Sequence, residues 1–296
     1  MNPESGGSRP WYWLDVFTDT ALSGNGLAVV LEADGLEPET MLGFAREVGL
    51  SETTFVQTAT VEGADYRNRI WTVSGEIPFA GHPSLGTAVA VAVHERGGCA
   101  PGGGGRSFTQ QTGVGVQKVR ADFRDGSWQA SVHQEPAVFG ETFARAGVAA
   151  ALGLAPSRMD PELSCQVAST GLPALLAPVC DLDALADCSP DFDALRTLDD
   201  RPALNLYAFA YERGSRAVRA RCFGADLSGI EDPATGSAAG PLVAYLQDCL
   251  DIDRIVVEQG VEMGRPSRIE ARIESGRPLV SGAVTILASG TVFLPG

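Results

Sequence analysis

The sequence is short of basic residues. Its 296 residues include 22 lysines and arginines against 37 aspartates and glutamates, which gives a formal net charge of −15 at pH 7. Nucleic acids and anionic membrane surfaces repel such a protein, so neither is expected as a partner. A small anionic ligand is not excluded, because a few hydrogen-bond donors in a cleft outweigh a distant surface field.

Long apolar runs are also missing. The longest candidate, residues 87–93, has seven residues, whereas a helix that spans a bilayer needs about 20. Residues 1–10 are polar and lack the basic-then-apolar order of a secretory signal. We therefore expect a cytoplasmic protein without a membrane partner.

Cysteine and histidine are scarce and scattered. The six cysteines form no CxxC pair and do not group with the three histidines. A zinc site is therefore not expected, and a chain of this length does not need disulfides to be stable. We interpret the cysteines as reduced and mostly packed in the core.

Strand-like runs dominate what is present, and they recur in both halves. Each half has one prominent helix directly after a small-residue turn, near residues 84–95 and 236–249. This mixture predicts an α+β fold with mixed or antiparallel sheets, rather than the alternating βαβ of a Rossmann fold. Pro136 marks the boundary between two similar halves with a cleft between them. We expect a further helix over residues 141–152 and a surface loop over the glycine-rich residues 97–105.

Three segments interrupt their local pattern, and functional residues tend to lie at such places. Glu52 precedes an apolar strand, a position that is by itself more typical of a solvated edge charge. His82 lies in a Gly-His-Pro turn at a helix start, and Asp232 precedes the small-residue turn of the second half. Pro241 is difficult to place within that second helix. The helix begins near Gly240, or its first turn is irregular.

Two such turns suit an anionic ligand. The free backbone N–H groups at a helix start bind anions, and two helix starts at a shared cleft would suit a carboxylate substrate. The three titratable residues of the interrupted segments could then move protons. A nucleophilic mechanism is less favoured, because Ser84 and Ser237 lack a Gly-x-Ser-x-Gly turn and no cysteine lies in these segments.

The motifs resemble those of the PhzF-like family, named for the phenazine-biosynthesis isomerase, which shares the diaminopimelate-epimerase-type fold. The matching segments run in order along nearly the whole chain. They are Leu14-Asp15-Val16-Phe17-Thr18, Gly24-Asn25-Gly26-Leu27-Ala28-Val29-Val30, Ser51-Glu52-Thr53-Thr54-Phe55, Phe79-Ala80-Gly81-His82-Pro83, Thr170-Gly171-Leu172-Pro173, Glu231-Asp232-Pro233-Ala234-Thr235-Gly236-Ser237-Ala238, Gln259-Gly260 and Met263-Gly264-Arg265-Pro266-Ser267.

The resemblance implies two half-barrel domains, each a mixed sheet wrapped around a central helix, with the active site between them. The last strand of this fold commonly returns to the first domain. The expected domains are therefore residues 9–135 with 284–296, and residues 136–283. The resemblance also implies a homodimer and acid–base chemistry without a cofactor or a metal.

The resemblance assigns roles to particular residues. The glutamate that moves a proton along a conjugated ring in the phenazine enzyme matches Glu52. The family's histidine and aspartate match His82 and Asp232.

The residues that hold the substrate carboxylate match Gly81, Gly236 and Ser237. The two cysteines of the epimerase relatives are replaced here by Ala80 and Pro233, which excludes racemisation by two thiols.

Three functions stay open at this point. The first is an isomerase that shifts a proton, and with it a double bond, in a small cyclic or unsaturated amino or hydroxy carboxylic acid. The pathway would belong to bacterial secondary metabolism, with a phenazine-like or an alkylproline-like precursor. The second is a racemase or epimerase that uses Glu52 and Asp232 as opposed bases. The third is a small-molecule binder without catalysis, which the intact set of Glu52, His82 and Asp232 disfavours.

Overall fold

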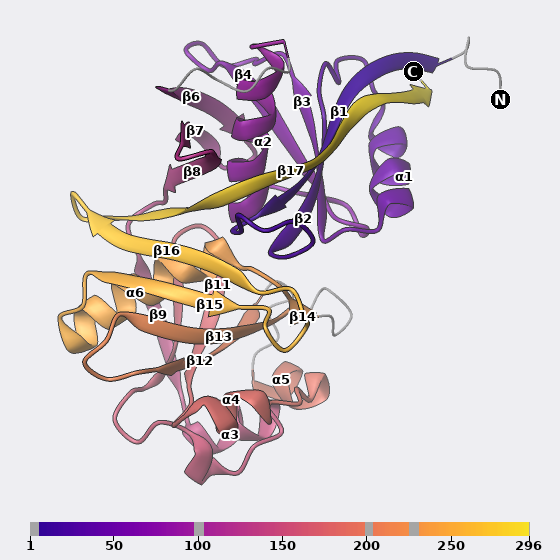
Figure 1. The fold of residues 1–296 in the computed structure, drawn as a ribbon. Helices are drawn as coiled ribbons and strands as arrows, with labels where there is room; N and C mark the ends of the chain where they lie inside the picture. Colours follow the sequence, from indigo (N-terminus) through magenta and orange to yellow (C-terminus); the bar gives the residue numbers. More distant parts are fainter. Residues whose placement is uncertain (1–5, 98–103, 199–203, 225–230, 296) are drawn as a thin grey trace. The chain divides into compact units, whose positions relative to one another are not determined.

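The chain divides into two compact units in the computed structural model, which describes residues 6–97, 104–198, 204–224 and 231–295. Unit 1 comprises residues 1–133 and 281–296, and unit 2 comprises residues 134–280. Strand β17 (Arg277–Pro295) belongs to both units, and its C-terminal part lies beside the first strand of the chain (Figure 1).

Unit 1 is a mixed sheet around one helix. Its further elements are β1 (Gly6–Val16), β2 (Asn25–Val30), α1 (Pro38–Val48), β3 (Glu52–Gln57), β4 (Tyr66–Trp71), β5 (Glu76–Ile77), α2 (Gly81–His94), β6 (Gly104–Thr112), β7 (Gly115–Arg124) and β8 (Ser127–His133). Neighbouring strands follow the order β17, β1, β2, β3, β4, β6, β7, β8, and β8 in turn pairs with β17.

The two helices of unit 1 lie on different faces of the sheet. Helix α2 packs against β1, β2, β3, β4, β7 and β8, and its residues from Gly81 to Val93 are all buried. A helix that is apolar on all sides is stable only when it is enclosed, which explains its central position. Helix α1 instead buries one side, where Met41 and Ala45 contact Phe55 and Trp71.

Unit 2 has a second mixed sheet around a second helix. Its elements are β9 (Val138–Phe143), α3 (Arg145–Ala151), a 3₁₀ turn (Pro156–Arg158), β10 (Cys165–Ser169), β11 (Pro173–Pro178), α4 (Leu182–Ala186), α5 (Phe192–Leu198), β12 (Asn205–Tyr211), β13 (Ala217–Gly224), β14 (Glu231–Asp232), α6 (Gly236–Leu250), β15 (Arg254–Gln259) and β16 (Ser267–Glu274).

The strands of unit 2 present alternate side chains to two sets of helices. Helix α6 packs against β10, β11, β15 and β16, and the rings of Phe209 and Tyr245 meet edge to face with centroids 6.3 Å apart. The neighbouring side chains Leu206 and Ala208 point to the other face. There they share a core with the short helices α3, α4 and α5.

The two units repeat one pattern of strand pairing. In unit 1, β1–β2, β3–β4 and β6–β7 are antiparallel, and β2–β3 and β4–β6 are parallel. In unit 2, β10–β11, β12–β13 and β15–β16 are antiparallel, and β11–β12 and β13–β15 are parallel. Helices α2 and α6 follow equivalent short strands, β5 and β14. The predicted α+β fold of two related units, each built around a central helix, is confirmed.

Some local predictions need correction. The helix expected over residues 141–152 begins only at Arg145, because residues up to Phe143 form β9 and pair with β10. Helix α6 begins at Gly236 and keeps Pro241 inside it, so the alternative start near Gly240 is wrong. Most of the expected glycine-rich loop, residues 98–103, lies outside the described residues, and Gly104 already belongs to β6.

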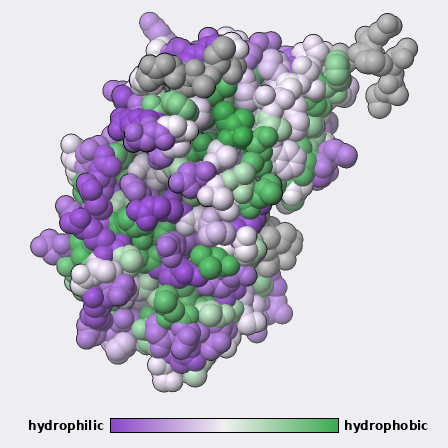
Figure 2. All heavy atoms as spheres, in the orientation of Figure 1, coloured by the Kyte–Doolittle hydropathy of each residue, from purple (hydrophilic) through white to green (hydrophobic). Residues whose placement is uncertain are grey.

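Figure 2 shows hydrophilic side chains spread over both units, with hydrophobic side chains gathered in the upper part of the view. Among the described residues, no helix combines the length and the apolar character that crossing a bilayer requires.

Candidate active site

Glu52 and His82 come together in unit 1. Glu52 is the first residue of β3, and His82 is the second residue of α2, which begins after the extended Ala80. The carboxylate oxygen Oε2 of Glu52 lies 3.4 Å from Nε2 of His82, and the two side chains are 16 % and 5 % exposed. Two of the residues predicted as catalytic, Glu52 and His82, therefore lie in nearly buried contact between a strand start and a helix start.

His82 is held in its neutral form. Burial lowers its pKa to about 3, and a hydrogen bond with the backbone of Gly26 opposes that shift only in part. The amide nitrogen of Asn25 lies 3.2 Å from Nδ1 of the same ring. At neutral pH the ring is therefore an uncharged imidazole with one N–H donor and one acceptor nitrogen.

Asn25 is placed by an unusual loop between β1 and β2. Phe17, Leu22 and Gly24 all adopt left-handed backbone conformations, with φ values of 66°, 66° and 61°. The buried carboxylate of Asp15 accepts a hydrogen bond of 2.7 Å from the backbone N–H of Leu22. These contacts fix the loop that ends at Asn25, and with it the partner of His82.

Asp232 lies in unit 2 at the end of β14, where it pairs with Cys222 of β13. The hydroxyl of Thr235 is 2.5 Å from Oδ2 of Asp232, and Gln259 donates to the backbone carbonyl of Asp232 at 2.7 Å. The start of β14 is anchored as well. Arg221 holds Glu231 through two hydrogen bonds of 2.9 and 2.8 Å and also donates to carbonyls at the C-terminal end of α4.

Gly236 and Ser237 form the first turn of α6, and both are buried. The side chain of Gln134 donates to the carbonyl of Gly236 at 2.9 Å and accepts from the hydroxyl of Thr170 at 2.5 Å. Pro241 has no N–H to donate to the carbonyl of Ser237, four residues earlier. The helix continues through it nonetheless, because its position in the buried core is fixed by the surrounding sheet.

Neither central helix has a side-chain cap at its N-terminus. Neither Ala80 before α2 nor Thr235 before α6 caps its helix through its side chain. The first N–H groups of a helix have no partner within the helix, and together with the helix dipole they form a site for an anion. Each predicted carboxylate-binding residue therefore lies where the backbone can bind a carboxylate: Gly81 in unit 1, and Gly236 and Ser237 in unit 2.

The partners of the predicted residues were not themselves predicted as site residues. Asn25 and Gln259 lie in the recognised motifs, but no role was assigned to either. For Gln259 the sequence carries a signal: alternation along β15 places it on the same buried face as Ile255 and Val257. A polar residue on an apolar face needs hydrogen-bond partners, and this predicts a buried network.

The side chains that could bind a metal ion do not cluster in the described part of the chain. Within those residues no three His, Cys, Asp or Glu side chains are placed to hold a metal ion. The five described cysteines form no disulfide with one another; they are Cys165, Cys180, Cys188, Cys222 and Cys249.

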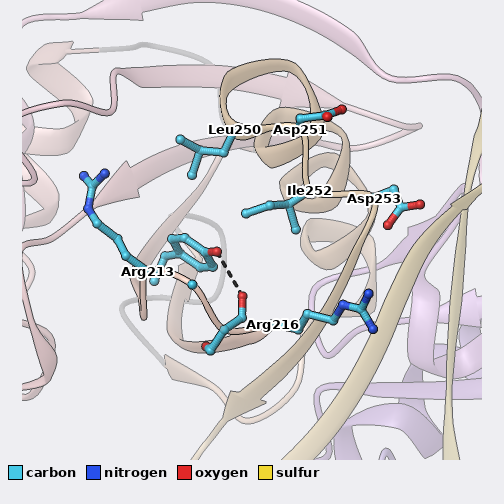
Figure 3. A pocket seen from close by; sticks show the side chains of 9 residues that line it. Arg213, Arg216, Leu250, Asp251, Ile252 and Asp253 are labelled. Atoms are coloured by element: carbon cyan, nitrogen blue, oxygen red, sulfur yellow. Dashed lines mark hydrogen bonds between the residues drawn. The ribbon is translucent and has the colours of Figure 1, made fainter.

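Unit 2 has two surface pockets that are separate from the predicted site residues. One, of about 520 Å³, is formed by the turn between β12 and β13 and by the residues that follow α6. Leu250 and Ile252 project toward its interior, and Arg216 extends toward Asp253 (Figure 3). The other, of about 640 Å³, lies over β12, β13 and β15. Neither pocket is lined by a predicted site residue.

The fold and these side chains define a class of α+β proteins built from two repeated units, each with polar groups at the start of a buried central helix. Residues 14–292 match the PhzC-PhzF family, described as phenazine biosynthesis-like protein. The chain belongs to this family, as its motifs indicated.

The chain is similar to a protein named as an isomerase and to solved structures of the same family. The chain is 38 % identical to the trans-2,3-dihydro-3-hydroxyanthranilate isomerase of Pseudomonas aeruginosa, over 96 % of each sequence. Among solved structures, it matches a predicted epimerase from Pseudomonas aeruginosa with a TM-score of 0.82 and 33 % identity, over 96 % of this chain and 99 % of that one. A PhzF-family protein from Bacillus anthracis matches with a TM-score of 0.83 and 27 % identity, over 97 % and 99 %.

Proposed function

We propose that the protein is a cofactor-independent isomerase that moves a proton, and with it a double bond, in a small cyclic or unsaturated amino or hydroxy carboxylic acid. The observation that carries this proposal is the contact between Glu52 and a neutral His82. Membership in the PhzC-PhzF family supports the reaction class. The substrate named for the Pseudomonas aeruginosa relative, trans-2,3-dihydro-3-hydroxyanthranilate, is the first compound to test.

Glu52 carries the proton in this mechanism. Because His82 is uncharged, it does not stabilise the charged form of Glu52 as a histidinium would. Glu52 takes the proton from one carbon of the conjugated system, whose electrons shift to form a new double bond. The same carboxyl then returns the proton to another carbon, so no proton is gained or lost.

The remaining residues bind and orient the substrate. The N–H groups of Gly81 and Gly236, with the hydroxyl of Ser237, hold the substrate carboxylate and stabilise negative charge that develops in the transition state. His82 and Asp232 contact the polar substituent of the substrate and fix which carbon faces Glu52.

The test is turnover in D₂O with the variant Glu52→Gln. General acid–base catalysis contributes about 10²–10⁴-fold to a rate, so we expect E52Q to lose at least about 10²-fold in kcat. Glu47→Gln, which changes an exposed glutamate of α1, is the matched control and should keep the original activity. A kcat of E52Q close to that of the original protein contradicts the proposal.

Epimerisation is the second candidate, and it is favoured by the 33 % identity to a solved protein described as a predicted epimerase. It would use Glu52 and Asp232 as opposed bases. The position of the deuterium distinguishes the two reactions. A double-bond shift places deuterium on a different carbon from the one that lost the proton. Epimerisation places it on the original stereocentre.

We also propose that the protein acts in the cytoplasm as a homodimer, which the family resemblance supports. Light scattering coupled to size-exclusion chromatography should give twice the 30.9 kDa of one chain. A mass of one chain at micromolar concentration contradicts the dimer.

A further inference from the structure

Gln259 is the centre of a buried hydrogen-bond network beside Asp232. It ends β15, and none of its side chain is exposed. Its Nε2 donates to the carbonyl of Asp232 at 2.7 Å and lies 2.9 Å from the hydroxyl of Thr235. Its Oε1 accepts from the backbone N–H of Thr235 at 3.1 Å and from the hydroxyl of Tyr207 at 3.1 Å. The hydrogen-bonding capacity of the amide is thus fully used.

The backbone determines which way this amide points. A backbone carbonyl only accepts and a backbone N–H only donates, so the nitrogen of Gln259 must face the carbonyl of Asp232 and its oxygen the N–H of Thr235. Nε2 has a proton for the Thr235 hydroxyl, which must accept it. The single proton of that hydroxyl then points to Oδ2 of Asp232, 2.5 Å away.

We propose that Thr235 and Gln259 are positioning residues for Asp232: the amide donates to the Thr235 hydroxyl, which in turn donates to Oδ2, and this bond holds the Asp232 side chain in one orientation as a carboxylate. The proposal rests on the proposed function only for the part that Asp232 plays in the reaction. A hydroxyl that donates to Oδ2 stabilises the charged form of Asp232 more than the protonated form.

Several other titratable groups lie near Asp232 and could affect its charge. Burial raises the pKa of Tyr207 well above its ordinary value, so its phenol stays protonated and donates to Gln259. Glu231 is paired with Arg221, and the buried Cys222 lies opposite Asp232 on β13. The first turn of α6 has no acidic or basic residue. The hydroxyl of Thr235 donates directly to the carboxylate, at 2.5 Å from Oδ2.

The decisive measurement is the titration of Asp232 itself, which needs no substrate. In protein labelled with ¹³C at the aspartate carboxyl carbons, the Asp232 signal is the one that is missing from D232N. We expect Thr235→Val to move the titration midpoint of that signal upward by about one pH unit, a tenfold change in proton affinity. Thr235→Ser, which keeps the hydroxyl, should titrate like the original protein.

Valine has the shape of threonine, and no side-chain cap of α6 is lost with the hydroxyl. Thr235→Ala serves as the second variant if T235V does not fold. Equal midpoints in the original protein and in the variant without the hydroxyl overturn the proposal.

Activity on trans-2,3-dihydro-3-hydroxyanthranilate separates this inference from the proposed function. If D232N keeps full activity, the role of Asp232 in the reaction is wrong, while a shifted titration in T235V still supports the positioning by Thr235. If D232N is inactive and T235V titrates like the original protein, the positioning is wrong and the proposed function stands.

Discussion

The neutral state of His82 is a consequence of where the fold places the ring. Its pKa of about 3 lies far below the value of about 6.5 for an exposed histidine, because burial disfavours the charged form. Above pH 6.5 the ring is neutral in the folded and the unfolded chain and has no effect on stability. As the pH falls from 6.5 toward 3, only the unfolded chain takes up this proton, so folding stability is lost.

His82→Gln should therefore flatten the pH dependence of stability. The histidine contributes up to about 1.4 kcal/mol per pH unit to the free energy of unfolding below pH 6.5, and glutamine contributes none. Urea denaturation at a series of pH values between about 7.5 and 4.5 measures this slope. His94→Gln is the control, because that ring lies at the surface beside Glu32. A slope in H82Q as steep as in the original protein would show that the buried ring does not carry the effect.

The sequence predicted residues of the site better than it predicted their contacts. Glu52, His82 and Asp232 interrupt local patterns, and such interruptions are visible in a linear sequence. Asn25 lies 57 residues from His82, and Gln259 lies 24 residues from Thr235. Contacts of this kind depend on strand register and on which face of a strand is buried, and neither is fixed until the sheet has formed.

At the scale of elements, the start of α6 is fixed by a side chain from outside the helix. Gln134 lies against the helix backbone between Gly236 and Gly240, and a Cβ atom at position 240 would lie less than 2 Å from its Oε1. Gly240→Ala should therefore displace Gln134 and break its bonds to Gly236 and Thr170. We expect a loss of about 2–4 kcal/mol in the free energy of unfolding, measured by urea denaturation.

Gly43→Ala is the matched control for this prediction. Gly43 lies in the exposed part of α1 and has no atom within 4 Å of an added Cβ. Alanine is favoured over glycine inside a helix, so G43A should stabilise the protein by about 0.5–1 kcal/mol. Equal effects of the two substitutions would mean that helix propensity, and not the contact with Gln134, decides the outcome at position 240.

Long-range pairing also explains which elements sequence patterns missed. The repeated helices α2 and α6 were predictable, because each is an apolar run directly after a small-residue turn. The segment up to Phe143 was predicted as the start of a helix, but it forms a strand because its backbone pairs with Cys165 and Gln166. Pro241 was treated as an obstacle to a helix start at Gly236, yet packing in the core outweighs its local cost.

At the scale of the whole molecule, the net charge of −15 opposes the approach of an anionic substrate. In the proposed mechanism the helix starts bind the substrate carboxylate at hydrogen-bond distance, about 3 Å. The charge of the surface instead acts over the Debye length. That length is about 30 Å at 0.01 M salt and about 8 Å at 0.15 M. Salt should therefore weaken the repulsion more than it weakens binding at the helix starts.

This difference gives a prediction that distinguishes the surface from the site. We expect kcat/KM for a carboxylate substrate to rise about two- to fivefold between about 10 mM and about 300 mM NaCl, mainly through a lower KM. An amide analogue of the same substrate, which is uncharged, should show almost no salt effect on its binding. If kcat/KM instead falls as salt is added, the field at the approach to the site is positive. The N–H groups at Gly81 and Gly236 would then outweigh all the surface acids even at a distance.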